Sequence, residues 1–170
     1  MAEQEMRLHR CCFTGHRPEK LQASEENVKA WLNNQIDIAI SQGFVTFITG
    51  CAMGVDIWAG QIVIEKRKQN PTLHLIAASP YPGFGNRWKD EWRRQYNQLL
   101  KDADLVRYIS ERYSDDCFMI RNRWMVDHSS LVIAAYNGAP GGTRNTIDYA
   151  KKAGITVVQV IPEEKGDSHD

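Results

Sequence analysis

The sequence predicts an α/β fold: a three-layer αβα Rossmann-like domain with a mostly parallel sheet of about six strands. Three observations predict it. Short apolar, β-rich runs alternate along the chain with longer amphipathic segments. The segments between these runs are long enough to form the crossover helices that parallel strands need. The runs are continuously apolar, as expected for a sheet that helices cover on both faces.

The first half of the chain predicts three strands and two helices. Residues 7–14 form the first apolar strand. Ser24 is a good N-cap for a helix whose apolar residues recur at helical spacing, and Gly43 ends that helix. The other elements of this half are a strand, a helix and a strand at residues 44–49, 53–69 and 72–79.

The second half continues the alternation. Its helices are expected at residues 88–101, 115–128 and 143–153, and its strands at residues 103–109, 131–136 and 155–161. Residues 79–87 carry two prolines and two glycines, so this longest irregular loop is a candidate lid. We expect residues 1–170 to form a single Rossmann-like domain, with residues 163–170 as a polar, frayed tail.

Composition excludes several classes of protein. Lys and Arg number 21, as do Asp and Glu, so the net charge is zero. A broadly basic surface that would bind duplex DNA is therefore not expected. The four cysteines form no C-x-x-C pair and the five histidines show no chelating spacing, so no metal site is predicted. The start is polar and acidic and no apolar run approaches a membrane span, so we expect a cytoplasmic protein without membrane contact.

The carboxyl ends of the predicted strands indicate where a ligand binds, because ligands of open α/β sheets bind beyond these ends. Three of the segments there are glycine-rich turns that lead into helices, where backbone N–H groups and the helix dipole attract an anion. These turns predict a phosphate or nucleotide site. The candidate ligand-binding residues are Thr14, Gly15, His16, Arg17, Gly50, Gly54, Asp56, Ser79, Arg121, Asn122, Asn137, Gly141, Gly142 and Thr143.

Several of these residues also have a purely structural interpretation. Gly50 and Gly54 fit a tight turn without any ligand. Asp56 either complements a helix dipole, accepts hydrogen bonds from ligand hydroxyls or holds a neighbouring loop. Arg17 suits a bidentate anion clamp, with pairing to Glu19 as the alternative.

Residues on two of the predicted helices also have both a functional and a structural interpretation. Arg121 shares a strip with Phe118 and Met125, and an arginine on an apolar face needs an anion or a cavity. The alternative for Arg121 is a solvated basic face. Trp88 and Trp92 lie among basic residues, but at a spacing of four they are expected to pack on the sheet.

Four motifs together resemble the SLOG superfamily. They are the Thr-Gly-His-Arg-Pro run at residues 14–18, the Gly-x-Ala-x-Gly-x-Asp loop at residues 50–56, Arg-Asn-Arg at residues 121–123 and Pro-Gly-Gly-Thr at residues 140–143. This superfamily unites the Smf/DprA DNA-processing proteins with the LOG ("lonely guy") phosphoribohydrolases. The first motif and the compact length look most like its YpsA-like branch, whose members are largely of unknown function. The resemblance covers residues 7–161 and implies a Rossmann-like fold that binds nucleotides or nucleotide-derived ligands.

The LOG resemblance also implies a catalytic pair. LOG members hydrolyse the N-glycosidic bond of a nucleoside 5′-monophosphate with an arginine from an Arg-x-x-x-Met helix and a glutamate beyond a Pro-Gly-Gly loop. Arg121 and Met125 match the first motif, and Asp148 stands where the glutamate would be. Arg121 and Asp148 are therefore the catalytic candidates of this alternative.

We expect a small positive pocket on a neutral protein, with Arg17, Arg121 and Arg144 facing one sheet edge. It would take a nucleotide-type ligand of the AMP, NAD or ADP-ribose class in a sensory or regulatory role. A nucleoside 5′-monophosphate phosphoribohydrolase is the first alternative. Single-stranded DNA binding, as in Smf/DprA, is a second alternative that the neutral charge disfavours. Homo-oligomerisation stays open.

Overall fold

The computed structural model describes residues 2–160 and has the expected α/β architecture. Its strands are β1 (Arg10–Gly15), β2 (Thr46–Thr49), β3 (His74–Ser79), β4 (Leu105–Tyr108), β5 (Leu131–Ala135) and β6 (Thr156–Val160). They form one sheet in the order β4-β3-β2-β1-β5-β6, and every neighbouring pair is parallel. The tail expected at residues 163–170 lies outside the described residues.

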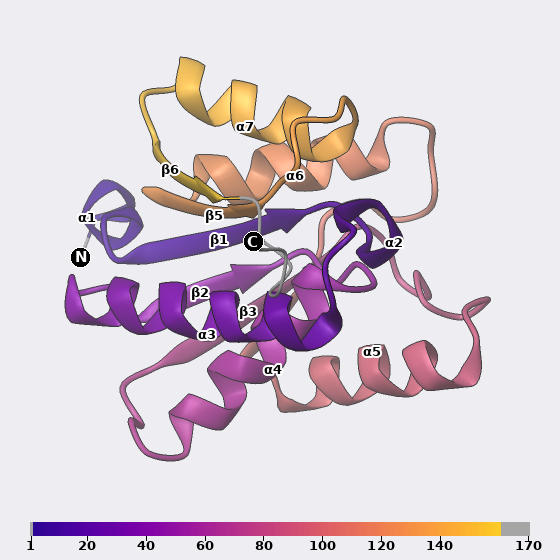
Figure 1. The fold of residues 1–170 in the computed structure, drawn as a ribbon, viewed down its shortest axis with the longest axis horizontal. Coiled ribbons are helices and arrows are strands. Elements are labelled where there is room, and N and C mark those ends of the chain that lie inside the picture. The colour runs from indigo at the N-terminus through magenta and orange to yellow at the C-terminus, as the bar shows by residue number, and fades with distance from the viewer. Residues whose placement is uncertain (1, 161–170) are drawn as a thin grey trace, which may run out of the picture.

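Helices cover both faces of this sheet, which confirms the three layers (Figure 1). One face carries α3 (Glu25–Ser41), α4 (Val55–Arg67) and α5 (Asp90–Asp102). The other face carries α6 (Cys117–Asp127) and α7 (Gly142–Lys152). No helix within the described residues is long and apolar enough to cross a membrane.

Helix ends lie close to where capping chemistry predicts them. The Ser24 hydroxyl accepts the N–H of Asn27 at 3.0 Å and so caps α3. Gly43 follows that helix with φ +100°, a left-handed conformation that glycine adopts without strain. Gly154 ends α7 in the same way with φ +78°.

Two short helices were not predicted. α1 (Glu3–Arg7) occupies residues that the sequence placed partly in the first strand, so β1 begins at Arg10 and not at residue 7. The Glu3 carboxylate pairs with Arg10 at 2.6 Å and fixes this helix against the strand. α2 (Pro18–Leu21) has proline in its first turn, where a missing N–H is tolerated.

The sheet separates two apolar cores because successive strand residues point to opposite faces. Cys11 and Phe13 of β1 belong to the core under α3, α4 and α5, where Phe13 stacks on Phe47 with ring centroids 5.9 Å apart. Cys12 belongs to the core under α6 and α7. Thr14 therefore points towards the α6–α7 layer.

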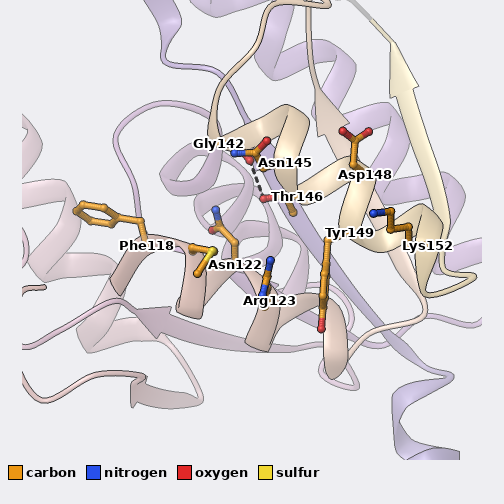
Figure 2. Close-up of a pocket in the computed structure, with 10 residues that line it drawn as sticks. Phe118, Asn122, Arg123, Gly142, Asn145, Thr146, Asp148, Tyr149 and Lys152 are labelled. Atoms are coloured by element: carbon orange, nitrogen blue, oxygen red, sulfur yellow. Dashed lines mark hydrogen bonds between the residues drawn. The ribbon is translucent and has the colours of Figure 1, made fainter. Parts of the chain in front are cut away.

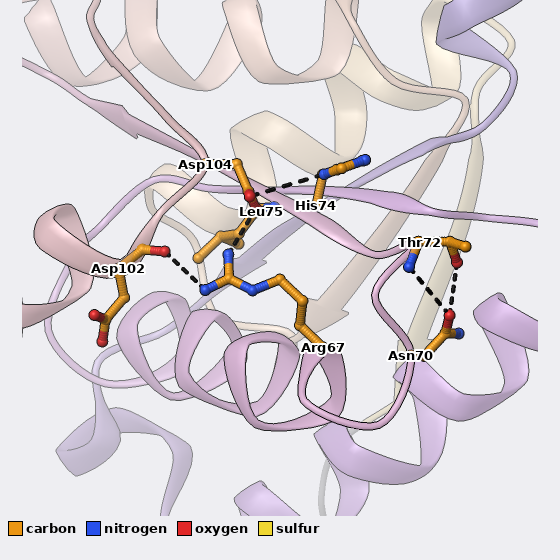
Figure 3. A network of polar contacts seen from close by, with 7 residues as sticks. All are labelled: Arg67, Asn70, Thr72, His74, Leu75, Asp102 and Asp104. Carbon is orange, nitrogen blue, oxygen red and sulfur yellow. Dashed lines mark hydrogen bonds and ion pairs between the residues drawn. The ribbon is translucent and has the colours of Figure 1, made fainter.

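A polar network fixes the amino-terminal edge of the sheet, opposite the carboxyl ends (Figure 3). The Asp104 carboxylate accepts the N–H of Leu75 and a guanidinium N–H of Arg67, each at 2.8 Å. Arg67 also donates to the carbonyl oxygen of Asp102 at 3.1 Å. Burial acts to raise the pKa of Asp104, but these hydrogen bonds and the Arg67 charge outweigh it and lower the pKa. The network joins the end of α4 to the starts of β3 and β4.

Candidate functional site

The strand order places a topological switch point at the carboxyl ends of β1 and β5. From β1 the chain moves to β2, β3 and β4 on one side, and it then returns to β5 and β6 on the other. The connections that leave β1 and β5 therefore run to opposite faces of the sheet (Figure 1). Ligands of open α/β sheets bind at such a switch point. The candidate site is thus bounded by residues 15–18 after β1 and residues 136–142 after β5.

The loop after β1 packs tightly against the start of α4. A Cβ on Gly15 would lie 2.6 Å from the Val55 side chain, and a Cβ on Gly54 would lie 2.7 Å from Pro18 Cδ. Gly54 also has φ +91°. Close packing therefore requires both glycines. Arg17 is exposed between them and forms no ion pair within residues 2–160.

The loop after β2 is held by Asp56 in the first turn of α4. The buried Asp56 carboxylate accepts the backbone N–H of Ala52 at 3.3 Å. The backbone carbonyl oxygen of Asp56 accepts the Thr49 hydroxyl at 2.6 Å. Burial raises the pKa of Asp56 to about 6, opposed in part by the charge of Arg121 and the Ala52 hydrogen bond. Of the roles that the sequence left open for Asp56, this geometry supplies the loop-holding one.

Arg121 reaches the same loop from α6. Its guanidinium donates to the carbonyl oxygen of Gly50, and its Nε donates to Asn122 Oδ1 at 2.7 Å. A Cβ on Gly50 would lie 2.8 Å from Asp56 Oδ2 and 3.1 Å from Arg121 Cζ, so the two charged groups flank this glycine. Burial lowers the pKa of Arg121, while the charge of Asp56 acts to raise it. The Arg121 charge is thus directed at the loop after β2.

The glycines that begin α7 are in a different situation. Gly141 is the N-cap with φ +142°, Gly142 is the first helical residue, and both are exposed. A Cβ on either would meet nothing within 4 Å. The first N–H groups of a helix have no partner within the helix, and its dipole favours an anion there. This loop therefore offers the open backbone that a phosphate needs.

His16 belongs to the loop after β1 and contacts the end of β5 and the loop that follows it. His16 is 5% exposed, and its backbone N–H donates to the Ala135 carbonyl oxygen at 3.1 Å. The centroid of its imidazole ring lies 5.3 Å from that of the Tyr136 ring. The Nε2 atom of His16 is buried without a hydrogen-bond partner. Burial and then the charge of Lys20 lower the pKa of His16, while a hydrogen bond with the Asn137 side chain acts to raise it. Tyr136 packs against the core under α6 and α7, so the His16 ring lies on that side of the sheet.

A groove of about 310 Å³ runs between α6 and α7 beside Gly142 (Figure 2). Phe118 lies towards one end of it, and Asp148 and Lys152 lie towards the other. The Thr146 hydroxyl donates to the Gly142 carbonyl oxygen at 2.9 Å and stabilises the first turn of α7. The groove is lined by Phe118, Met119, Asn122, Arg123, Gly142, Asn145, Thr146, Asp148, Tyr149 and Lys152.

The predicted site residues fall into two groups. Asn122, Gly142 and Asp148 share the groove, whereas Arg121 is buried behind it. Within the described residues no hydrogen bond or ion pair joins Arg121 to Asp148, which is exposed on α7. The structure therefore does not bring the two catalytic candidates into contact.

The remaining predicted residues have protein partners. The Ser79 hydroxyl hydrogen-bonds the Tyr96 hydroxyl at 2.7 Å. The Asn137 side chain donates to the Lys20 carbonyl oxygen at 2.6 Å and accepts the Ala139 N–H at 2.9 Å. Asn137 thus shapes the loop after β5. Thr143, one residue inside α7, is buried.

Of the α7 residues that line the groove, only Gly142 and Asp148 were predicted from the sequence. Asn145, Tyr149 and Lys152 recur with Asp148 at spacings of three and four, which places them on one helix face. That periodicity is the signal that could have identified the other three. Opposite them, the Arg123 guanidinium lies 4.9 Å from the centroid of the Tyr149 ring and closes the groove floor.

All four cysteines are buried and unpaired. Among residues 2–160, no group of three or more His, Cys, Asp or Glu side chains could hold a metal ion.

Comparison with known proteins identifies relatives of this chain. The YpsA family model, described as the YspA SLOG family, matches residues 11–157. An uncharacterized SPbeta prophage-derived protein of Bacillus subtilis, YoqJ, is 32% identical over 118 residues, covering 62% of this chain and 69% of its own length. A UPF0398 protein of Bacillus cereus is 27% identical over 150 residues, covering 83% of this chain and 82% of its own length.

Solved structures share the fold. DNA processing protein A (DprA) of Helicobacter pylori, described with its single-stranded DNA binding mode, superposes with a TM-score of 0.64 at 16% identity, over 96% of this chain and 69% of that one. DprA of Streptococcus pneumoniae gives a TM-score of 0.58 at 17% identity over 95% of this chain. This chain spans about half of the pneumococcal protein, 53% of its length.

Proposed function

This chain belongs to the YspA SLOG family, and from that premise we propose that it binds a nucleotide or nucleotide-derived ligand in a sensory or regulatory role. The ligand would bind between the loops after β1 and β5. Its phosphate would accept hydrogen bonds from the backbone at the start of α7, and the rest of the molecule would extend into the groove between α6 and α7.

The observation that carries this proposal is the combination of one imidazole nitrogen without a hydrogen-bond partner and an open helix start at one switch point. His16 Nε2 is buried without a partner, which is rare for a polar atom in a folded protein. Gly141 and Gly142 leave their backbone open at the start of α7. A ligand with phosphate oxygens would give both groups a partner at once.

The groove supplies contacts for a base and a sugar. Phe118 is an exposed aromatic ring at one end, suited to stacking on a nucleobase. Asn122 and Asn145 add amide donors and acceptors, and the Asp148 carboxylate can accept hydrogen bonds from ribose hydroxyls. A volume of about 310 Å³ is close to the lower end of the range of small-molecule sites.

Binding without turnover fits the arrangement of the charged residues better than hydrolysis does. Hydrolysis of an N-glycosidic bond would need Arg121 and Asp148 to act on one sugar. Arg121 instead donates to Gly50 and Asn122. Incubation of the protein with nucleoside monophosphates should therefore release no free base. Release of free base that is abolished in Asp148→Asn would show that the protein is a hydrolase and would overturn the sensing proposal.

Single-stranded DNA binding is a second candidate function that one observation favours. Tyr113 and Phe118 are exposed aromatic residues whose ring centroids lie 6.2 Å apart, and aromatic surfaces of this kind stack on unpaired bases. The Helicobacter pylori neighbour is described as a single-stranded DNA binder. The zero net charge weighs against it, because strand binding draws on many phosphate contacts. A gel shift at moderate salt should show no complex.

A thermal-shift screen tests the main proposal. The full chain is heated with AMP, NAD, ADP-ribose and cyclic nucleotides at millimolar concentration. A ligand present at one hundred times its dissociation constant adds about 2.7 kcal/mol of stability. At least one of these ligands should raise the melting temperature, and a screen without any stabilised condition would overturn the proposal.

A further inference from the structure

A second hollow lies at the same end of the molecule but on the other side of the loop after β1. It has a volume of about 450 Å³ and lies between the start of α5 and residues 17–19. None of its lining residues lines the groove between α6 and α7. Its walls include Arg17 and Met53 from the strand-end loops, and Trp88, Lys89 and Trp92 from the start of α5.

Two tryptophans form fixed walls of this hollow. Trp92 is half-buried against Trp58, with ring centroids 6.0 Å apart. Trp88 is half-buried against Phe84 and Tyr96, at centroid distances of 4.8 and 5.4 Å. Both pack on the core, as expected from the sequence, but both also face the hollow. Indole rings that are held from behind lose little conformational entropy when a planar group stacks on them.

The charged residues of the hollow favour an anion. Arg17 and Lys89 are exposed and form no ion pair or side-chain hydrogen bond within residues 2–160. Glu19 is the one acidic residue in the wall, so the wall carries a net positive charge. Asp90, next to Lys89, is already paired with Arg93. On a protein of zero net charge, this leaves a local positive field beside two indole rings.

We propose that this hollow is a second binding site, specific for a planar aromatic group that carries an anionic substituent. Trp88 and Trp92 would stack on the ring, and Lys89 and Arg17 would pair with the anion. The volume of about 450 Å³ is that of a small-molecule site and suits a nucleoside monophosphate or an aryl carboxylate. The site stands apart from the function proposed above, because a different set of residues forms it.

The test follows the indole N–H resonances of the full, ¹⁵N-labelled chain. Five tryptophans give five such signals, which single Trp→Phe variants assign. AMP and 4-hydroxybenzoate are titrated to millimolar concentration as the nucleotide and the carboxylate probe. The signals of Trp88 and Trp92 should move in a saturable way with at least one probe, while those of Trp31 and Trp124 stay in place. Movement with AMP alone assigns the site to nucleotides, and movement with both assigns it to aromatic anions in general.

Lys89→Gln tests the role of the charge, and Lys101→Gln at the other end of α5 is its matched control. Loss of one charge-assisted contact should weaken binding about tenfold in the first variant and leave it unchanged in the second. Equal affinity in the two variants would overturn the proposal. So would signals that stay in place with both probes, or that move only with a single-stranded oligonucleotide. Gly142→Asp should leave the response of the Trp88 and Trp92 signals unchanged. This variant therefore distinguishes failure of the proposal for this hollow from failure of the proposed phosphate site at the start of α7.

Discussion

Arg121 on α6 donates a hydrogen bond to the carbonyl oxygen of Gly50, 71 positions away in the loop after β2. This contact joins the α6–α7 layer to a loop that leads into the opposite helical layer. Asp56 lies on the other side of the same glycine and holds the rest of the loop. Arg121, Gly50 and Asp56 thus form one structural unit at the carboxyl end of β2.

Removal of the Arg121 guanidinium should destabilise the protein. Arg121→Met leaves the Gly50 carbonyl oxygen without this partner and the buried Asp56 without a nearby cation, so we expect a loss of about 3 kcal/mol in the free energy of unfolding. Urea titration measures it. Arg123→Met removes an exposed guanidinium from the same helix and should lose less than about 1 kcal/mol. Equal losses in the two variants would show that Arg121 does not hold the loop.

A methyl group should destabilise the protein at Gly50 and have almost no effect at Gly142. At Gly50 it would approach Asp56 Oδ2 to 2.8 Å, so Gly50→Ala should lose about 1–3 kcal/mol of stability. At Gly142 it meets nothing within 4 Å, so Gly142→Ala should change stability by no more than about 0.5 kcal/mol. Melting temperatures of the two variants, measured side by side, decide this. A Gly50→Ala variant as stable as the unmodified protein would show that Asp56 and Arg121 do not pack tightly against Gly50.

Asp56 should make stability depend on pH. Its pKa is about 6 in the fold against an ordinary value of 3.8, so the folded state binds the proton more tightly than the unfolded chain. The stabilisation is present at low pH and is lost as the pH rises from about 4 to about 6. Asp56→Asn has no titrating group at this position. Its free energy of unfolding should therefore increase relative to that of the unmodified protein as the pH rises across this window. A difference between the two proteins that stays constant with pH would contradict the raised pKa.

Much of the fold could be predicted because its signals are local. Ser24 and Gly43 mark the ends of α3 through their own side-chain and backbone chemistry. α1 could not be predicted in this way, since its five residues are too few for a periodic pattern and it is fixed by the pair between Glu3 and Arg10.

The site was predictable to a similar extent. Gly141 and Gly142 end the short loop that follows an apolar strand, and their sequence context predicts an open helix start. The attachment of Arg121 to Gly50 depends on how α6 packs against the sheet, which no local pattern reveals. For the same reason, the resemblance to the LOG motifs paired Arg121 with Asp148, although no hydrogen bond or ion pair joins them within the described residues.

Isothermal titration of Gly142→Asp and Gly142→Asn with AMP, NAD and ADP-ribose tests the central claim most directly. Both side chains enter open space, and an acid at a helix start favours folding, so melting temperatures should show both variants folded. If the phosphate binds at the start of α7, Gly142→Asn should retain binding, whereas Gly142→Asp should lose at least about tenfold in affinity through charge repulsion. Equal affinity for the two variants, or no binding to the unmodified chain, would contradict the claim.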